Sequence, residues 1–180
     1  RDLVRSRGLG DVYKRQNRYR LTNDSEKIVE QCFAEHKPLS FEILDIDYFK
    51  QYNDRYGHQA GDDCVRAIVA LIRQMESDQI FCARYGGDEF VIIYSGMSAE
   101  EVCERAEKLR QDVMALQIEQ RYAEGSFGVT ISQGICHDIP SNGNKNWDFL
   151  HVADQALYRV KRRGRNRLCM TDIHGREIEV

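Results

Sequence analysis

The sequence feature that most limits the possible folds is the segment RYGGDEFVII at residues 84–93, where two glycines and two carboxylates separate apolar flanks. The flanks predict two antiparallel strands joined by a tight turn. A two-residue turn of the primed type requires positive φ, which Gly86 and Gly87 adopt without strain. Such a turn does not explain the adjacent acids Asp88 and Glu89. We therefore interpret these two residues as candidates for function.

The rest of the chain alternates between helical and strand-like periodicity. Apolar residues at spacings of three and four predict helices, and one helix opens with a capping box, Ser98-Ala-Glu-Glu101. The predicted helices are residues 17–36, 48–56, 61–75, the capped helix and 149–163, and the predicted strands are residues 40–45, 80–84, 90–94, 129–135 and 167–173. This order, with a hairpin in the middle, predicts an α+β domain with a single mixed five-stranded sheet flanked by helices.

Composition limits the partners of the chain. A net charge of −3, from 26 basic and 29 acidic residues, creates no global field that attracts nucleic acid. No apolar run approaches the length of about 20 residues that a membrane span needs, and there is no signal-peptide pattern. The six cysteines show no C-x-x-C spacing, so we interpret them as free thiols in a reducing cytosol. We expect a cytoplasmic domain that binds no nucleic acid and carries no membrane segment.

The first residues differ from the rest, because they begin without Met and show neither helical nor strand periodicity. We interpret residues 1–16 as a non-native leader or, alternatively, as a natural basic linker, and exclude them from the fold. The length of 180 residues suits one domain, which we place at residues 17–173, with residues 174–180 as a C-terminal tail. We expect a fragment whose upstream sensor or dimerisation domain is missing; that upstream region can include a membrane anchor.

A second group of acids, Asp45-Ile-Asp47-Tyr-Phe-Lys50, follows the first predicted strand. If that strand lies beside the central hairpin, Asp45 and Asp88 converge from neighbouring strand ends. Two converging carboxylates near a lysine suit Mg²⁺ and a nucleoside triphosphate, because Mg²⁺ takes one or two carboxylates and completes its shell with waters and phosphate oxygens. The alternative, that each acid is only a solvated strand-end residue, stays open at this point.

Three segments resemble the GGDEF family of diguanylate cyclases. Residues 86–90 read GGDEF, the signature of that family. DIDYFKQYNDRYGHQAGDD at residues 45–63 is similar to its D-x-D-x-F-K-x-x-N-D-x-x-G-H-x-x-G-D segment, and ADQALYRVKRRGRN at residues 153–166 is similar to its A-D-x-A-L-Y-x-A-K-x-x-G-R-N segment. The resemblance covers residues 17–170. It implies the palm or ferredoxin-like fold of nucleotidyl cyclases, and a homodimer of half-sites that joins two GTP molecules into cyclic di-GMP and releases pyrophosphate.

The resemblance also assigns roles to individual residues. Asp45 and Asp88, with the backbone carbonyl of Ile46, would ligate Mg²⁺, or Mn²⁺ in its place. Asp88, Glu89 and Lys50 match catalytic positions, and the sequence leaves open whether Asp88 or Glu89 takes the proton of the 3′-hydroxyl. The positions that match substrate-binding residues are Asn53 and Asp62, which would read guanine, together with His58, Gly86, Gly87, Tyr48, Phe49, Lys161 and Arg165.

Plainer structural interpretations of some of these positions remain open. Asp62 can complement the dipole at the start of a helix. His58 can be a structural residue beside a turn. Arg162 and Arg163, next to Lys161, can neutralise the C-terminus of a helix.

The sequence departs from the family pattern at two places. Many members carry an R-x-x-D product-binding site before the signature, but Ser77 and Ile80 occupy these positions here, so we expect no product inhibition through that site. The family's opening D-x-L-T-G-L segment should precede Asn17, where this chain has the leader. Since no acid or glycine of the signature is missing, we expect an active diguanylate cyclase. The alternatives are a GTP-binding regulatory module without turnover and another palm-type nucleotidyltransferase.

Overall fold

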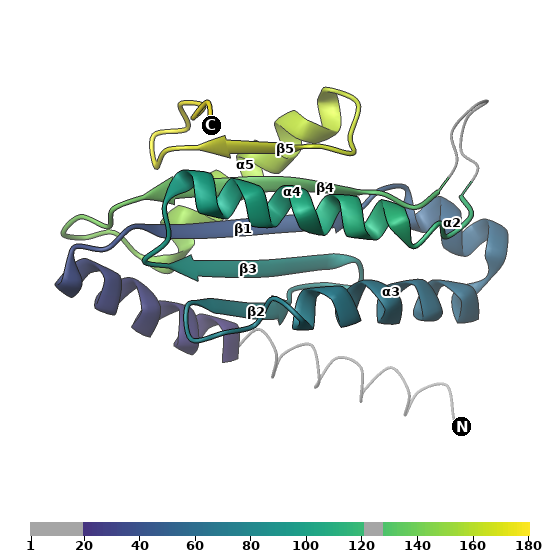
Figure 1. Ribbon diagram of the computed structural model, residues 1–180, viewed down its shortest axis with the longest axis horizontal. Coiled ribbons are helices and arrows are strands. Elements are labelled where there is room, and N and C mark those ends of the chain that lie inside the picture. The colour runs from purple at the N-terminus through teal and green to yellow at the C-terminus, as the bar shows by residue number, and fades with distance from the viewer. Residues whose placement is uncertain (1–19, 121–127) are drawn as a thin grey trace.

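The structure of the protein is a computed structural model that describes residues 20–120 and 128–180 (Figure 1). Residues 20–35 are helical and precede the labelled elements. These elements are, in chain order, β1 (Leu39–Ile46), α2 (Phe49–Tyr56), α3 (His58–Arg73), β2 (Ile80–Arg84), β3 (Glu89–Ser95), α4 (Ala99–Ala115), β4 (Ile131–Asp138), α5 (Asn146–Arg162) and β5 (Leu168–Thr171).

The strands of the described residues form one five-stranded sheet in the order β2-β3-β1-β4-β5. β1 lies at the centre and is antiparallel to both β3 and β4, whereas β4 and β5 are parallel. β1 is therefore buried along most of its length. The α+β class, the mixed five-stranded sheet and the central hairpin predicted from the sequence are confirmed.

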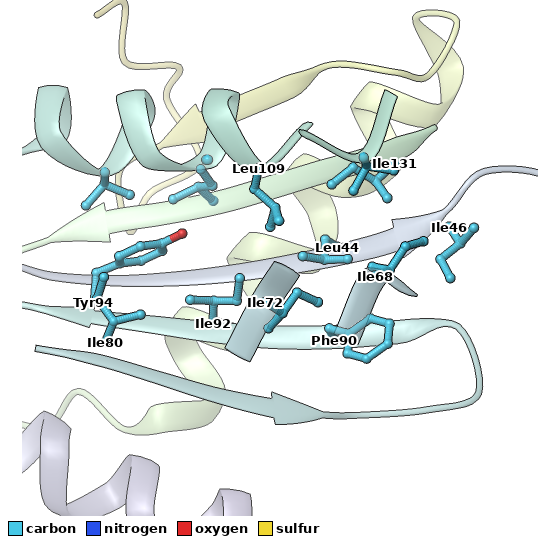
Figure 2. Packing of buried hydrophobic residues seen from close by; sticks show 14 of the residues in the cluster. Leu44, Ile46, Ile68, Ile72, Ile80, Phe90, Ile92, Tyr94, Leu109 and Ile131 are labelled. Carbon is cyan, nitrogen blue, oxygen red and sulfur yellow. The ribbon is translucent and has the colours of Figure 1, made fainter. Parts of the chain in front are cut away.

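Helices cover both faces of the sheet (Figure 1). Figure 2 shows Leu109 of α4 and Ile68 and Ile72 of α3 packed against Leu44 and Ile92 of the strands. Each of these side chains is at most 3% exposed, and burying one such side chain stabilises a fold by roughly 1.5–3 kcal/mol. The opposite face is covered by α5 and the helical residues 20–35. The sheet is thus a buried layer between helices on both faces.

α5 approaches β4 very closely at Gly134. A Cβ atom built on this glycine would lie 2.2 Å from the backbone nitrogen of Leu157, so no larger residue fits between helix and strand. The buried residues of α5, which include Phe149 and Val160, recur mostly at helical spacings of three and four. One face of the helix therefore packs onto the sheet. This packing fixes where the last turn of α5 lies relative to the end of the sheet, and that turn carries Lys161.

The turn between β2 and β3 differs from the prediction. Arg84 and Phe90 form the last paired residues, so five residues connect the strands instead of two. The backbone nitrogens of Tyr85 and Gly86 both donate to the carbonyl oxygen of Glu89, at 2.9 and 3.0 Å. Neither Gly86 nor its neighbour in the signature has a positive φ. The prediction of a primed two-residue turn is therefore wrong, because the longer loop turns the chain without left-handed residues.

Several predicted boundaries also shift; α5, for example, begins at Asn146 rather than at residue 149. α3 begins at His58 rather than at residue 61, because Gly57, with a φ of 87°, ends α2 and lets the next helix start at once. β4 begins at Ile131 rather than at residue 129, since Val129 instead donates its backbone N–H to Ile118. The capping box of α4 is confirmed: the backbone N–H of Glu101 donates to the Ser98 hydroxyl at 3.2 Å.

Within the described part of the chain, no helix combines the length and the apolar character that crossing a lipid bilayer requires.

Candidate active site

One end of the sheet gathers the segments that the motifs identified. β1 ends there, the β2–β3 turn and the start of α2 lie there, and the turn from α5 to β5 arrives at the same end (Figure 1). Asp45 is paired with Glu89 across the two central strands, and the backbone N–H of Ile46 donates to the carbonyl oxygen of Asp88 at 3.2 Å. Segments that are more than forty residues apart in the sequence therefore meet at this end of the sheet.

Asp45 is the most unusual side chain of this end. It is only 13% exposed, and its Oδ2 atom forms an ion pair with Lys161 of α5. Its Oδ1 atom is buried and has no hydrogen-bond partner. Burial raises the pKa of Asp45 to about 6, the negative charge of Asp88 adds to this rise, and Lys161 opposes it. The two carboxylates therefore lie close enough to repel each other. A cation between them would offset this repulsion and give the unpartnered oxygen of Asp45 a partner.

Asp47, two residues further on, has the opposite surroundings. Its carboxylate accepts hydrogen bonds from the hydroxyls of Thr130 and Ser132, at 2.7 and 2.6 Å, and from the backbone N–H of Asn166 at 3.1 Å. Its own N–H donates to the carbonyl oxygen of Thr130 at 2.9 Å. Burial raises the pKa of Asp47, and these hydrogen bonds oppose the rise. Asp47 thus ties the end of β1 to the start of β4 and to the α5–β5 turn.

Sequence reasoning placed Asp47 in the acid cluster but gave it no role. The available signal was the pair of hydroxyl residues Thr130 and Ser132, which are separated by a single residue. That signal becomes meaningful only once the β1–β4 pairing is known, because it joins residues that are 83 and 85 positions from Asp47.

The α5–β5 turn is built from left-handed residues. Gly164, Arg165 and Asn166 have φ values of 105°, 64° and 47°. The guanidinium carbon of Arg165 lies 4.5 Å from the centre of the Tyr48 ring, which suits a cation–π contact. Tyr48 itself has a φ of 54°. A left-handed residue other than glycine costs roughly 1–2 kcal/mol, so the contacts made by these residues must hold the turn in place.

α2 and α3 carry the positions expected to read the base. Asn53 is half-buried on α2, and Asp62 is exposed on α3, just after its first turn. Lys50 and His58, on the first turns of the same helices, are exposed, and neither bonds to Asp45 or Asp88 within the described residues. The structure therefore brings Lys161 to the carboxylates, whereas Lys50 and His58 point to solvent.

The glycines of the signature leave room at the carboxylates. Around Gly87 there is no atom within 4 Å of the place that a Cβ would occupy, and the residue is exposed. At Gly86 a Cβ would lie 3.1 Å from Oε2 of Glu89, so a side chain there would press on that carboxylate. The loop consequently presents bare backbone toward open space beside Asp88.

Two carboxylates alone do not form a complete metal cage. In the described residues no group of three or more His, Cys, Asp or Glu side chains could hold a metal ion. Asp45 and Asp88 nevertheless fit Mg²⁺, which binds proteins through one or two carboxylates and keeps waters and substrate oxygens in its shell. The unpartnered Oδ1 of Asp45 is an acceptor aimed at no protein donor, as a ligand for such an ion needs to be.

A separate hollow of about 600 Å³ lies between the helical residues 20–35, α3 and β2. Its lining includes Arg20, Arg66, Arg73 and Arg84 but neither of the paired aspartates. Size alone would point to this hollow. We place the candidate site at the carboxylates, because they combine close like charges, an unpartnered oxygen and a facing lysine.

A mixed sheet that presents two carboxylates and a cationic helix end at one end of its strands fits the palm-like fold of nucleotidyl cyclases. A family model described as "Diguanylate cyclase, GGDEF domain" matches residues 14–167. The chain therefore belongs to the GGDEF domain family, and the membership predicted from its three segments is confirmed.

Similar proteins support this assignment. A diguanylate cyclase of Vibrio cholerae is 34% identical over 165 residues, which is 86% of this chain and 46% of that protein. Diguanylate cyclase DosC of Escherichia coli is 32% identical over 162 residues, 89% of this chain and 34% of that protein. The chain thus spans less than half the length of these two relatives.

Solved structures agree on the fold. The GGDEF domain of DgcB from Caulobacter crescentus, determined in complex with c-di-GMP, has a TM-score of 0.74 and 31% identity, and covers 84% of this chain and 87% of that one. The active GGEEF domain of a diguanylate cyclase from Vibrio cholerae has a TM-score of 0.72 and 32% identity, with 84% and 94% coverage. The predicted palm-like cyclase fold is confirmed.

Proposed function

We propose that the protein is a diguanylate cyclase that joins two GTP molecules into cyclic di-GMP and two pyrophosphates with the help of Mg²⁺. The observation that carries this proposal is the pair Asp45 and Asp88, in which Asp45 has a raised pKa, an unpartnered oxygen and the facing Lys161. The similarity to proteins named diguanylate cyclases supports the choice of reaction.

The chain's own residues would divide the work as follows. Asp45 and Asp88, with the Ile46 carbonyl, would hold the ion, which when bound neutralises phosphate charge and lowers the pKa of the attacking hydroxyl. Asp88 or Glu89 would accept the proton of the 3′-hydroxyl. Lys161 is 32% exposed, so its ammonium group can face a triphosphate as well as Asp45. With Arg165 it would offset the negative charge that develops on the phosphates.

Base selection would rest on α2 and α3. The Asp62 carboxylate can accept from N1–H and N2–H₂ of guanine together, a pair of donors that adenine does not offer. Asp62 is exposed, and no ion pair within the described residues occupies it. The Asn53 amide, on the facing helix, would supply a second polar contact to the base.

A homodimer of half-sites is part of the proposal. Each domain would hold one GTP, and bond formation needs two such sites facing each other. A dimerising domain upstream would raise the effective concentration of one domain near another without new contacts between them. Activity should therefore depend on protein concentration when association is weak.

Product inhibition through the R-x-x-D position should be absent. Ser77 and Ile80 form a tight antiparallel bridge, with backbone N–O distances of 3.1 and 3.2 Å, and Ile80 is 4% exposed. A bidentate arginine contact to a guanine edge is worth about 1–3 kcal/mol, and no such arginine stands here. Any inhibition by cyclic di-GMP should therefore be competitive with GTP.

The test is to incubate the purified chain with GTP and Mg²⁺ and to identify products by mass spectrometry over a range of protein concentrations. We expect cyclic di-GMP, with a specific activity that rises with concentration. The variant Asp154→Asn, which changes an exposed acid of α5, should behave as wild type in this assay. GTP binding without product would instead support the regulatory-module alternative, and a different linear or cyclic product would support another nucleotidyltransferase.

A further inference from the structure

Gly61, in the first turn of α3, is buried against a side chain of α2. A Cβ atom built on Gly61 would lie 1.7 Å from Oδ1 and 2.9 Å from Cγ of Asn53, and 3.4 Å from Cζ of Phe49. Real Cβ atoms essentially never approach a heavy atom outside their own residue and its chain neighbours within 3.0 Å. The amide of Asn53 therefore occupies the space that any side chain at position 61 would need.

Backbone conformation does not explain this glycine. Gly61 lies inside α3, its φ is not positive, and its N–H donates to the carbonyl oxygen of Gly57 at 3.1 Å in the ordinary helical pattern. Within a helix, glycine is less favourable than alanine. A glycine that helix formation disfavours and backbone geometry does not require is explained here by the space it leaves for Asn53.

Helix packing alone does not explain it either. The two atoms that a Cβ would strike belong to the Asn53 side chain and not to the backbone of α2. The amide of an asparagine can rotate about its side-chain torsions, so an added methyl group would displace the amide before it separated the helices. The contact at Gly61 therefore governs where the Asn53 amide lies rather than whether α2 and α3 pack together.

The position of this amide matters because of its neighbour. Asp62 follows Gly61 directly, so the surface that supports Asn53 is one residue from the carboxylate proposed to read guanine. Within the described residues, no side-chain hydrogen bond anchors the Asn53 amide to another protein group. The missing side chain of Gly61 is thus what leaves room for the amide of Asn53 at the start of α3, the helix that also carries Asp62.

We infer that Gly61 is a positioning residue for base selection: it holds the Asn53 amide where, together with Asp62, it can contact the edge of a guanine base. This inference rests on the proposed function, because it assumes that α2 and α3 bind the base of GTP. It assigns to Gly61 no contact with the nucleotide.

The experiment compares wild type, Gly61→Ala, Asn53→Ala and the double variant. Calorimetric titrations with GDP and ADP, which cannot be condensed, measure base selectivity as the ratio of the two dissociation constants. Thermal unfolding measures stability. Gln59→Ala, at an exposed position two residues before Gly61 on α3, is the control and should match wild type in both measurements.

We expect Gly61→Ala to lower the preference for GDP over ADP on the order of tenfold, similar to Asn53→Ala, as the loss of one polar base contact predicts. Its unfolding midpoint should stay within a few degrees of wild type. In the Asn53→Ala background, Gly61→Ala should lower selectivity no further and should raise the midpoint, because the clash is gone and alanine favours the helix.

Other outcomes overturn the inference. If wild type binds GDP selectively and Gly61→Ala keeps that selectivity, Gly61 does not position the amide, although the proposed function stands. If Gly61→Ala weakens GDP and ADP equally or fails to fold, its role is purely structural. If wild type itself does not prefer GDP, the proposed guanine site fails first, and the inference fails with it.

Discussion

Asp45 and Asp47 stand two residues apart at the end of the same strand. Asp47 is buried and Asp45 is largely buried, yet their surroundings are opposite. Asp47 accepts three hydrogen bonds, which connect β1, β4 and the α5–β5 turn. Asp45 has one oxygen without a partner, a like charge beside it and one lysine. Burial raises the pKa of both carboxyls, but only at Asp47 do neutral donors compensate for the lost water.

The difference fits the proposed division of roles, in which Asp47 stabilises the fold and Asp45 binds the metal ion. A buried polar group is normally hydrogen-bonded, so an exception needs an explanation. Asp47 needs none. Asp45 lies in an arrangement that costs stability in the metal-free protein, as we expect of the proposed metal ligand before its ion binds. Substitutions at the two positions should consequently separate activity from stability.

The largest effect should come from Asp45 and Asp88, the proposed metal ligands. Asp45→Asn and Asp88→Asn each remove a charged ligand, and we expect either change to lower the rate of cyclic di-GMP formation by at least about a thousandfold, equivalent to about 4 kcal/mol of transition-state stabilisation. Folding should survive, because Asp45 makes one ion pair, with Lys161, whereas Asp47 accepts three hydrogen bonds. Steady-state rates with Mg²⁺ as the only divalent metal, together with circular dichroism, check both parts. Wild-type rates in either variant would remove the metal assignment.

Asp47→Ala should act on stability instead. Two buried hydroxyls and one backbone N–H would lose their acceptor, and each stranded donor costs about 1–3 kcal/mol, so we expect a loss of about 3–5 kcal/mol in the free energy of unfolding. Urea unfolding at constant pH measures this loss.

Asp47→Asn is the matched control, because it keeps one acceptor oxygen and nearly the same volume. Its loss should be clearly smaller than that of Asp47→Ala. Equal losses would mean that charge rather than hydrogen bonding matters at Asp47, and a loss below about 1 kcal/mol in Asp47→Ala would show that the three hydrogen bonds do not hold the elements together.

How much of this could be predicted from the sequence differs between fold and site. Helix and strand periodicity identified each labelled element, and the capping box at Ser98 and Glu101 located the start of α4, because such signals are local. The turn at Gly86 and Gly87 was mispredicted because glycine permits positive φ without requiring it. Loop length is set by which residues pair, and the Arg84–Phe90 pair is a property of the sheet.

The site was predictable only where a motif named its residues. Asp45 and Asp88 could be expected to meet once their strands were assumed adjacent. The support given by Asp47 could not be foreseen, because its partners Thr130 and Ser132, at the start of β4, are far from it in the sequence. The same holds for Gly61, whose reason for being glycine is a contact between two helices.

The smallest expected effect is the pH dependence of stability, which is also the sharpest test of the comparison between Asp45 and Asp47. The folded-state pKa of Asp45, about 6, lies above the value of about 3.9 expected for an unfolded chain. The folded protein therefore binds this proton more tightly. The stability that the protonated form contributes is fully present below about pH 4 and is lost as the pH rises through about 6.

Asp45→Asn removes this titration. In the absence of divalent metal, the free energy of unfolding of the variant should therefore increase relative to that of wild type as the pH rises from 4 to 7. The gain is at most about 3 kcal/mol, since one pKa unit corresponds to about 1.4 kcal/mol, and we expect about 1–2 kcal/mol because Lys161 loses its partner in the variant. Urea unfolding of both proteins at several pH values measures the difference. Asp154→Asn, at an exposed position, should follow wild type throughout. A constant difference between wild type and Asp45→Asn across this range would show that Asp45 is already stabilised as a carboxylate, and the contrast with Asp47 would then be lost.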